Sequence, residues 1–492
     1  MSRGLDGDVT TLARRIAELG AGQRSRVFKL SWWSDRMLDW AMARPDFKAQ
    51  LFRFVDVFPA LHGDDDVAAH LGDYFAGIAI PKALDLGIYA ADHLPFGHAI
   101  EARVARRNIA QMAEQFIIGQ TPAEAVAGLE RLWRQGSAAT CDLLGEKTLV
   151  AAEADRYAAR VVELLTTLSA SAVRWAPDDL LERDDLGVVP RVNVSVKATA
   201  LAAHLSPLAA DVGIAEAKDR LRPIFNLARD LGAFVYVDME HFDVKDLTLR
   251  VFRELLDEDG MHAVRAGIVI QAYLRDARDD IAGLIAWSSG RAEPITVRLV
   301  KGAYWDTETV QARAEGWPAS VFEHKVETDA SYERCVRLLH DHHGEVRAAF
   351  ASHNLRSLAY SITYGRSLGI PDNGFEIQML HGMAEPIQAA IRRLGLRLRV
   401  YAPVGELVPG MAYLVRRLLE NTSNDSFVRH RFAEGRDLDE LLAPPAVDHL
   451  PDAATPTRRE PTDDDAPGAY RPEPVAEWRR GPVRDAMRAA VT

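Results

Sequence analysis

The sequence predicts an α/β protein, a (β/α)8 TIM-type barrel preceded by an all-helical arm and domain. Two observations predict this fold. Beyond Gly187, short runs of strand character alternate with helical stretches, which is typical of a parallel sheet covered by helices. Before Asp185, apolar residues recur every three or four positions, as they do in amphipathic helices. The alternation favours a closed barrel, with an open parallel sheet as the alternative.

Residues 1–185 are expected to form the helical arm and domain. The helical pattern is clearest at 35–43, 99–118 and 122–135. The last of these has the residues of a helix start: Thr121 suits the cap, proline follows it, and Glu124 lies three residues after the cap.

Residues 186–441 are expected to form the barrel, and residues 442–492 an extended or disordered tail rich in Pro, Asp and Thr. Runs of strand character occur at 192–196, 234–237, 266–272, 295–300, 348–351, 375–379 and 396–401. Helical runs follow at 215–230, 244–257, 331–340, 387–394 and 409–420. A closed barrel of this class needs eight strands. One strand is therefore hidden in the sequence or misread.

The composition is that of an ordinary folded protein in a reducing compartment. Of 492 residues, 48% are hydrophobic and 26% are charged, which excludes disordered, collagen-like and disulfide-stapled chains. Lys and Arg total 59 against 71 Asp and Glu, a net charge of −12, which disfavours a general nucleic-acid binder. Cys141 and Cys335 lie far apart without CxxC spacing and are expected to be buried thiols.

Neither an export signal nor a membrane span is apparent in the sequence. Residues 1–14 are polar and carry charges of both signs, unlike a secretory signal. The least polar stretch, 71–96, is interrupted by Asp73, Pro81, Lys82, Asp85 and Asp92. We therefore expect a cytoplasmic protein without a transmembrane segment, and peripheral contact with the inner face of the membrane stays open.

Polar side chains end or directly follow the predicted strands. The carboxyl ends of barrel strands converge on one mouth, where the sites of this fold are built. A single charged strand end more often only meets solvent, but a whole set in one register predicts a site. The set is Lys197, Asp238, Glu240, Gln271, Arg298, Lys301, His353, Asn354, Gln378 and Tyr401.

An arginine pair lies on the last predicted helix. Tyr413 and Glu420 stand three or four residues from Arg416 and Arg417 and can brace the guanidiniums. Guanidiniums offer planar forks of donors that suit a carboxylate or phosphate ligand. By itself, however, this pattern fits a solvated helix face better.

Motifs for several common sites are absent from the sequence. It contains no GxGxxG, GxxxxGK[ST] or GxSxG, so a Rossmann-type nucleotide site, a phosphate loop and a serine nucleophile lack support. His340, His342 and His343 lack fixed ligand spacing, which favours exposed histidines over a metal site. We predict no metal.

Five segments together resemble one family. They are CDLLGE from Cys141, RLVKGAYWD from Arg298, FEIQMLHGM from Phe375, YAPVG from Tyr401 and YLVRRLLEN from Tyr413. In this order they resemble the proline dehydrogenase domain of bacterial proline utilization A proteins. The resemblance runs from about residue 28 to residue 432, and residues 24–61 are similar to the N-terminal helical arm of these bifunctional enzymes.

The resemblance implies a distorted (β/α)8 barrel that holds FAD over the strand ends. It implies oxidation of L-proline to Δ1-pyrroline-5-carboxylate by hydride transfer to flavin N5, the first step of proline catabolism to glutamate. The electrons would pass from the reduced flavin to a membrane quinone.

The resemblance also assigns roles residue by residue. Arg298, Lys197 and Asp238 would be catalytic. The substrate pocket would consist of Lys197, Asp142, Glu146, Tyr304, Tyr401, Tyr413, Arg416, Arg417 and Glu420. The flavin cradle would consist of Asp238, Met239, Gln271, Arg298, Val300, Lys301, Gly302, Ala303, Trp305, Ser352, His353, Asn354 and Gln378. Three cations among these would grip the proline carboxylate and fix its pose.

The sequence also departs from the family pattern. The bifunctional relatives continue into an NAD-dependent aldehyde dehydrogenase domain, whereas this chain ends at Thr492. We expect a monofunctional or truncated form, with a separate aldehyde dehydrogenase as a candidate partner. A basic N-terminal DNA-binding segment is absent, so no nucleic-acid partner is expected. Residues 198–204 and Asp425 differ from the family forms.

Two other functions remain open at this point. The first is a flavin dehydrogenase for hydroxyproline or another cyclic amine. Tyr401 would pack on the substrate ring and clash with a hydroxyl group, which favours proline. The second is a catalytically idle subunit that docks a separate aldehyde dehydrogenase through residues 28–61.

Overall fold

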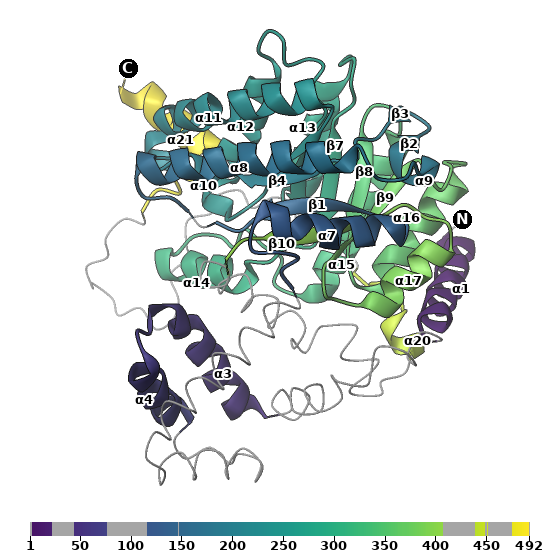
Figure 1. The fold of residues 1–492 in the computed structure, drawn as a ribbon, viewed down its shortest axis with the longest axis horizontal. Helices are drawn as coiled ribbons and strands as arrows, with labels where there is room; N and C mark the ends of the chain where they lie inside the picture. Colours follow the sequence, from purple (N-terminus) through teal and green to yellow (C-terminus); the bar gives the residue numbers. More distant parts are fainter. Residues whose placement is uncertain are drawn as a thin grey trace, which may run out of the picture.

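Eight parallel strands close into a barrel at the centre of the protein (Figure 1). The computed structural model describes residues 2–21, 44–75, 116–145, 147–406, 438–447, 450 and 475–491. Around the barrel the strand order is β1-β10-β9-β8-β7-β6-β5-β4. The strands are β1 (Ser137–Leu143), β4 (Asn193–Lys197), β5 (Phe234–Asp238), β6 (Ala266–Gln271), β7 (Thr296–Val300), β8 (Arg347–Ala351), β9 (Phe375–Leu380) and β10 (Leu398–Val404).

The barrel prediction and its seven predicted strands are confirmed, and β1 is the strand that the sequence pattern hid. It pairs with β10 along its whole length, from Ser137 beside Leu398 to Leu143 beside Val404. Its sequence, SAATCDL, contains one β-branched residue and follows a helix with only two residues between them. Small residues at that position carry little strand propensity. The barrel therefore begins well before residue 186, the start that we predicted for it.

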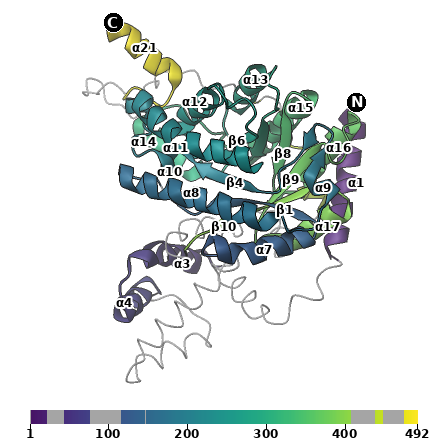
Figure 2. The same ribbon diagram turned by 45° about the horizontal axis from the view of Figure 1, so that its top comes forward.

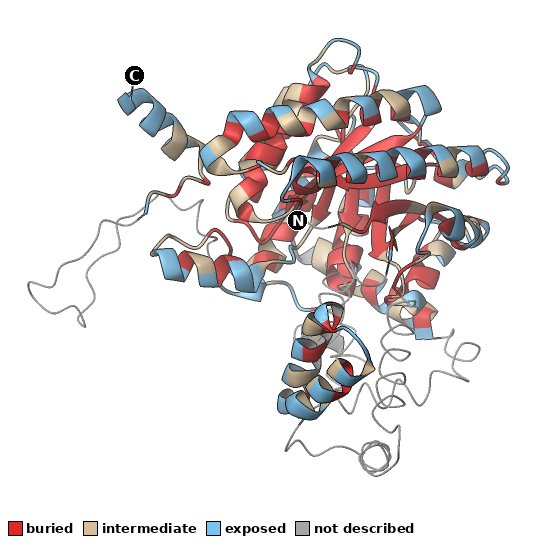
Figure 3. Ribbon diagram, turned by 60° about the vertical axis from the view of Figure 1, so that its left-hand side comes forward, coloured by how far each residue is buried: buried red, intermediate tan, exposed pale blue. Residues whose placement is uncertain are grey.

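Helices cover the outside of the barrel, and their inner faces pack on strands that are buried on both sides (Figure 3). The longer ones are α7 (Pro122–Arg134), α8 (Ala151–Ala172), α11 (Ala210–Leu231), α12 (Lys245–Leu256), α13 (Ala277–Ser288), α14 (Trp305–Glu315), α15 (Lys325–Asp341), α16 (Leu355–Ser367) and α17 (Glu385–Arg393). Short elements between them are α9 (Asp179–Glu182), α10 (Ala198–Leu201), η2 (Pro207–Ala209), η3 (Phe242–Val244) and the hairpin strands β2 (Arg183–Asp184) and β3 (Gly187–Val188).

Helix α7 begins as its sequence predicts. The Thr121 hydroxyl accepts a hydrogen bond from the Glu124 backbone N–H at 3.3 Å. The Glu124 carboxylate in turn accepts from the backbone N–H of Gln120 at 3.0 Å. The first bond satisfies an amide that the first turn of the helix leaves without a partner, and the second fixes the residue before the cap.

The N-terminal helix α1 (Ser2–Ala21) lies against α16 and α17 on the side of the barrel (Figure 2). Val9, Ala13 and Ile16 are fully buried there. Arg356 donates to Asp6 at 2.8 Å, which ties α16 to α1. Two further helices, α3 (Pro45–Val57) and α4 (Asp64–Phe75), follow with η1 (Phe58–Ala60) between them. Predicted helices at 35–43 and 409–420, and most of 99–118, lie outside the described residues.

The predicted extended or disordered tail, 442–492, is described in part, and its Pro- and Asp-rich stretch 451–474 lies outside the described residues. Residues 475–491 differ from the prediction. Helix α20 (Leu438–Leu441) is followed, after residues outside the described set, by α21 (Gly481–Val491) beside α11 and α12 (Figure 2). Arg479 anchors this segment. It is buried, pairs with Glu308 of α14 at 3.4 Å and lies over the Trp317 ring at 4.6 Å. Buried ion pairs and aromatic contacts thus replace the aliphatic core that the composition lacks.

Both cysteines are free and buried, as expected. Burial raises the pKa of the Cys141 thiol to about 12, and burial raises that of Cys335 to about 12 as well. Across the described part of the chain, no helix combines the length and the apolar composition that a membrane span needs.

Candidate active site

The carboxyl ends of the strands surround a pocket of about 300 Å³. Its lining contains most of the residues that the resemblance assigns. The lining residues are Asp142, Lys197, Asp238, Met239, Glu240, Val269, Gln271, Arg298, Val300, Lys301, Gly302, Ala303, Tyr304, Ala351, Ser352, His353, Gln378, Met379, Leu380 and Tyr401. Because eight parallel strands end here, residues from distant parts of the sequence meet in one cavity.

Arg298, on β7, is buried at the bottom of this pocket. Its Nη1 donates to the Asp238 carboxylate at 2.9 Å and to the Ser195 hydroxyl at 3.2 Å. The guanidinium lies 3.7 Å from the centre of the Tyr236 ring and 5.3 Å from that of Tyr401. Its Nε and Nη2 have no hydrogen-bond partner among the described residues. Two buried donor nitrogens therefore remain available to a ligand.

Asp238 links Arg298 to Tyr401. One of its carboxylate oxygens accepts from Arg298, and the other accepts from the Tyr401 hydroxyl at 2.7 Å. The charge on Arg298 is thus balanced within the barrel, and the Tyr401 ring is held in place at the pocket wall.

Lys197 and Asp142 form an ion pair between the ends of β4 and β1. The Asp142 side chain is 1% exposed, whereas that of Lys197 is 18% exposed. Burial disfavours the charged ammonium, but the attraction of Asp142, Tyr157 and Asp238 outweighs burial and raises the pKa of Lys197. Lys197 is therefore a cation over the whole physiological pH range.

Lys301 lies at the far side of the pocket, directly after β7. It pairs with Asp329 and lies 5.7 Å from the centre of the Tyr332 ring. Burial lowers the pKa of the Lys301 ammonium, and Asp329 opposes this shift. The next residue, Gly302, has φ +126°, and a Cβ there would lie 2.4 Å from the Tyr273 ring. Only glycine fits this close approach of the backbone to an aromatic ring.

Two glutamines present acceptors to the pocket. Gln271 donates its Nε2 to the backbone carbonyl of Glu240 at 3.2 Å, and Gln378 donates its Nε2 to Glu376 at 2.6 Å. A carbonyl and a carboxylate only accept, so both amide orientations are fixed. The Oε1 atoms of both glutamines are buried, and within the described residues neither has a hydrogen-bond partner.

One ring nitrogen of His353, Nε2, has a backbone partner. Its Nε2 accepts a hydrogen bond from the Leu380 backbone N–H at 3.0 Å, so this nitrogen carries no proton. The contact holds the imidazole between the ends of β8 and β9.

Two residues expected in the flavin cradle are not among the residues lining this pocket. Asn354 caps α16, and its Oδ1 accepts from the Ser357 backbone N–H at 2.9 Å. Trp305 donates its indole N–H to the Phe322 carbonyl at 2.7 Å and is 39% exposed. The Asn354 side-chain oxygen and the Trp305 indole N–H are thus used in contacts within the protein. The expected site residues Glu146, Tyr413, Arg416, Arg417 and Glu420 lie outside the described residues.

Residues without an assigned role also line the pocket. Glu240 accepts from the Thr199 hydroxyl at 2.6 Å, and burial raises the pKa of its carboxyl. Its place two residues after Asp238 at a strand end was a visible signal. The apolar wall of Val269, Ala351, Met379 and Leu380 had none, because apolar strand residues have the same pattern whether they face a core or a cavity.

The comparisons with known proteins agree with this geometry. The family model described as proline dehydrogenase matches residues 125–430, and that of the proline utilization A N-terminal domain matches residues 6–116. The chain belongs to the proline dehydrogenase family. The first match spans β1, which confirms that this strand is part of the domain.

Relatives of two architectures match this proline dehydrogenase family member. The bifunctional protein PutA of Klebsiella aerogenes is 34% identical over 69% of this chain and 26% of its own length. The proline dehydrogenase of Deinococcus radiodurans is 29% identical over 68% of this chain and 94% of its own length. This chain thus spans about a quarter of the length of the bifunctional relatives that it matches.

A solved structure has the same fold. The crystal structure of proline utilization A from Bdellovibrio bacteriovorus, inactivated by N-propargylglycine, matches with a TM-score of 0.86. It is 40% identical and covers 99% of this chain and 48% of that chain.

In the part of this chain that the structure describes, no cluster of histidine, cysteine or acidic side chains could hold a metal ion.

Proposed function

We propose that this protein is an FAD-dependent dehydrogenase that oxidises L-proline to Δ1-pyrroline-5-carboxylate. One observation carries the proposal. The pocket at the barrel mouth of this family member contains buried Arg298, Gln271 and Gln378, each with polar atoms that have no partner among the described residues. Such groups are costly to bury unless a ligand pairs with them.

The pattern of these atoms fits a flavin. Arg298 offers N–H groups on two nitrogens, Nε and Nη2, while Gln271 and Gln378 each offer one acceptor atom. The polar edge of an isoalloxazine carries acceptors at N5 and at two carbonyl groups, with a single N–H donor between the carbonyls. An apolar wall that includes Val269 and Met379 suits the flat face of such a ring.

The residues proposed to hold FAD are those of the expected set that line the pocket. They are Asp238, Met239, Gln271, Arg298, Val300, Lys301, Gly302, Ala303, Ser352, His353 and Gln378. When bound, FAD would accept the two electrons that leave the substrate as a hydride. The protein would place a permanent cation, Arg298, where negative charge accumulates during reduction.

Lys197 is proposed to bind the proline carboxylate. Its ammonium is protonated and partly exposed at the mouth, and the buried Asp142 holds it in position. Tyr304 and Tyr401 line the same pocket and would bound the substrate ring. The expected carboxylate clamp also includes Arg416 and Arg417. A cationic grip on one end of a small zwitterion fixes the carbon from which the hydride leaves.

The proposal includes a quinone as electron acceptor and contact with the inner face of the membrane. Both rest on the family resemblance.

The Tyr401 ring, held by Asp238, supports proline over hydroxyproline as the substrate, because a ring hydroxyl would meet that wall. The unpaired polar atoms support an active enzyme over an idle docking subunit.

The test uses the colour of the purified protein. We expect a yellow protein whose flavin absorption bleaches when L-proline is added without oxygen, with one pyrroline carboxylate formed per flavin reduced. Hydroxyproline in the same assay separates the two substrates. A protein that binds no flavin, or a flavin that proline does not bleach, would contradict the proposal.

A further inference from the structure

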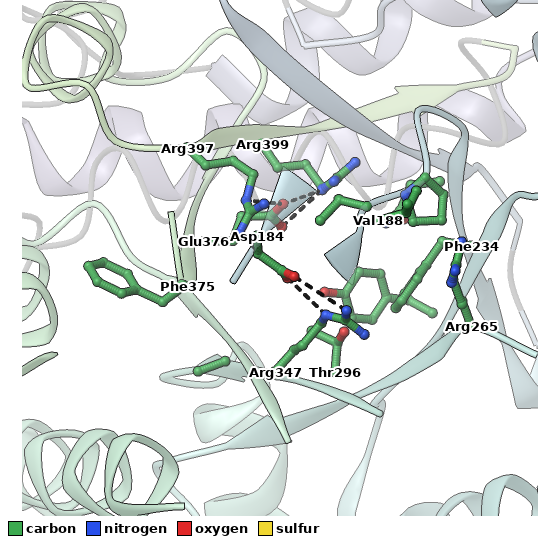
Figure 4. A pocket seen from close by; sticks show the side chains of 16 residues that line it. Asp184, Val188, Phe234, Arg265, Thr296, Arg347, Phe375, Glu376, Arg397 and Arg399 are labelled. Atoms are coloured by element: carbon green, nitrogen blue, oxygen red, sulfur yellow. Dashed lines mark hydrogen bonds and ion pairs between the residues drawn. The ribbon is translucent and has the colours of Figure 1, made fainter. Parts of the chain in front are cut away.

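A second, smaller pocket of about 40 Å³ lies at the opposite end of the barrel from the active site, where the strands begin. Charged side chains dominate it (Figure 4). Arg399 of β10 and Arg397, directly before that strand, extend toward Glu376. Asp184 of the β2–β3 hairpin pairs with Arg347 at 2.8 Å. Each carboxylate has its own nearest arginine, Arg347 for Asp184 and Arg399 for Glu376, and Arg397 lies within 4 Å of both.

Glu376 is firmly held in this cluster. It is buried, and both of its oxygens accept from the Arg399 Nε, at 2.9 and 2.8 Å. Arg399 is itself fixed by its Nη1, which donates to the Ala139 carbonyl of β1 at 2.8 Å. Two strands therefore determine where the Glu376 carboxylate lies, independently of any ligand.

The same carboxylate reaches upward to the active site. Its Oε1 accepts from the Nε2 of Gln378 at 2.6 Å, two residues further along β9. The Tyr236 hydroxyl lies 3.3 Å from that Nε2, and the Tyr236 ring lies beneath Arg298. Gln378 lines the active-site pocket, whereas Glu376 lines the smaller one.

We propose that Glu376 is a positioning residue for the cofactor. Because a carboxylate can only accept, it binds the NH2 group of Gln378 and forces the amide oxygen to be the atom left for the active site. Gln378 then offers an acceptor for an N–H or O–H of the flavin. An amide turned the other way would face the flavin with its NH2 group and lose that hydrogen bond. This inference rests on the proposed flavin site.

The experiment uses the full-length protein, freed of its flavin, and measures the affinity with which it binds added FAD. In Glu376→Gln the side-chain carbonyl can stay on the Arg399 Nε while the NH2 group faces Gln378, which favours the reversed Gln378 amide. We expect FAD to bind about tenfold more weakly, the loss of one hydrogen bond. Asp184→Asn is the matched control. It removes the other carboxylate of the same cluster with the same change of charge but does not touch Gln378, and FAD affinity should stay within twofold.

A second background separates positioning from a general structural effect. Gln378→Met removes the acceptor itself and should weaken FAD binding about tenfold as well. If Glu376 acts through Gln378, then Glu376→Gln adds nothing to FAD binding in the Gln378→Met protein. Equal losses in both backgrounds would overturn the proposal, as would unchanged FAD affinity of Glu376→Gln in the otherwise native protein.

Removing Glu376 leaves Arg399 without its counter-charge, so that variant can fail to fold. The double variant Glu376→Gln with Arg399→Met then replaces it, because it removes the stranded guanidinium together with its counter-charge. We expect about tenfold weaker FAD binding in the native background and no further loss in Gln378→Met. A native protein that binds no FAD refutes the proposed function instead, so the two failures are distinguishable.

Discussion

Replacing Lys197 by Met tests the ion pair at the mouth of the barrel. The change leaves the Asp142 carboxylate, 1% exposed, without its cation. Removing one partner of a buried pair costs about 3 to 5 kcal/mol of unfolding free energy. Lys218→Met is a matched control, because Lys218 is 19% exposed like Lys197, but its partners Glu254 and Glu258 are 39% and 26% exposed. A solvated pair of that kind contributes less than about 1 kcal/mol.

The stability loss of Lys197→Met should depend on pH in a defined direction. Burial raises the pKa of the Asp142 carboxyl, and in the variant no lysine opposes the shift. The folded state then keeps a proton that the unfolded state releases, so the unfolding free energy of Lys197→Met falls as the pH rises above the unfolded pKa. Lowering the pH toward that value should recover part of the loss relative to the native protein.

Urea unfolding followed by circular dichroism at pH 5 and pH 7.5 measures both effects. The double variant Lys197→Met with Asp142→Asn removes the stranded charge, and we expect it to regain most of the stability without the added pH dependence. The reasoning is refuted if Lys197→Met is as stable as Lys218→Met at pH 7.5. It is also refuted if its deficit is the same at both pH values.

Three further changes give separate tests. Arg298→Met should lower the rate of proline-dependent flavin bleaching at least about a hundredfold in stopped-flow measurements, because it removes the buried cation at the pocket floor; an unchanged rate would exclude that role. Gly302→Ala should lower the unfolding free energy by more than about 2 kcal/mol in thermal unfolding and release flavin, because its Cβ would lie 2.4 Å from the Tyr273 ring. Its control is Gly316→Ala, at φ +69° with open space around it, which should cost about 1 kcal/mol. Arg479→Met should destabilise the protein by about 3 kcal/mol and speed proteolysis near the C-terminus, because it breaks a buried ion pair. Replacing the exposed Arg488 by Met should change stability by less than about 0.5 kcal/mol. Equal effects of the two variants would exclude Arg479 as an anchor.

Much of the barrel could be predicted from local patterns. Runs such as 234–237 and 295–300 are apolar and β-branched, because strands buried on both faces require such residues. Strand β1 could not be predicted this way. Its small residues belong to the barrel because they pair with β10, near the other end of the domain. A local sequence pattern cannot show a pairing with so distant a segment.

The sequence by itself determined which residues gather at the mouth, since a polar residue that ends a parallel strand must face that edge of the barrel. Lys197, Asp238 and Arg298 were found in this way. Only the tertiary structure decided how they are paired and which atoms remain free. Asn354 follows a predicted strand yet caps a helix, and Glu376 orients Gln378 from the opposite end of the barrel. Hydrogen-bond partners depend on distances of a few ångströms between strands far apart in the chain, and those distances are set only when the barrel closes.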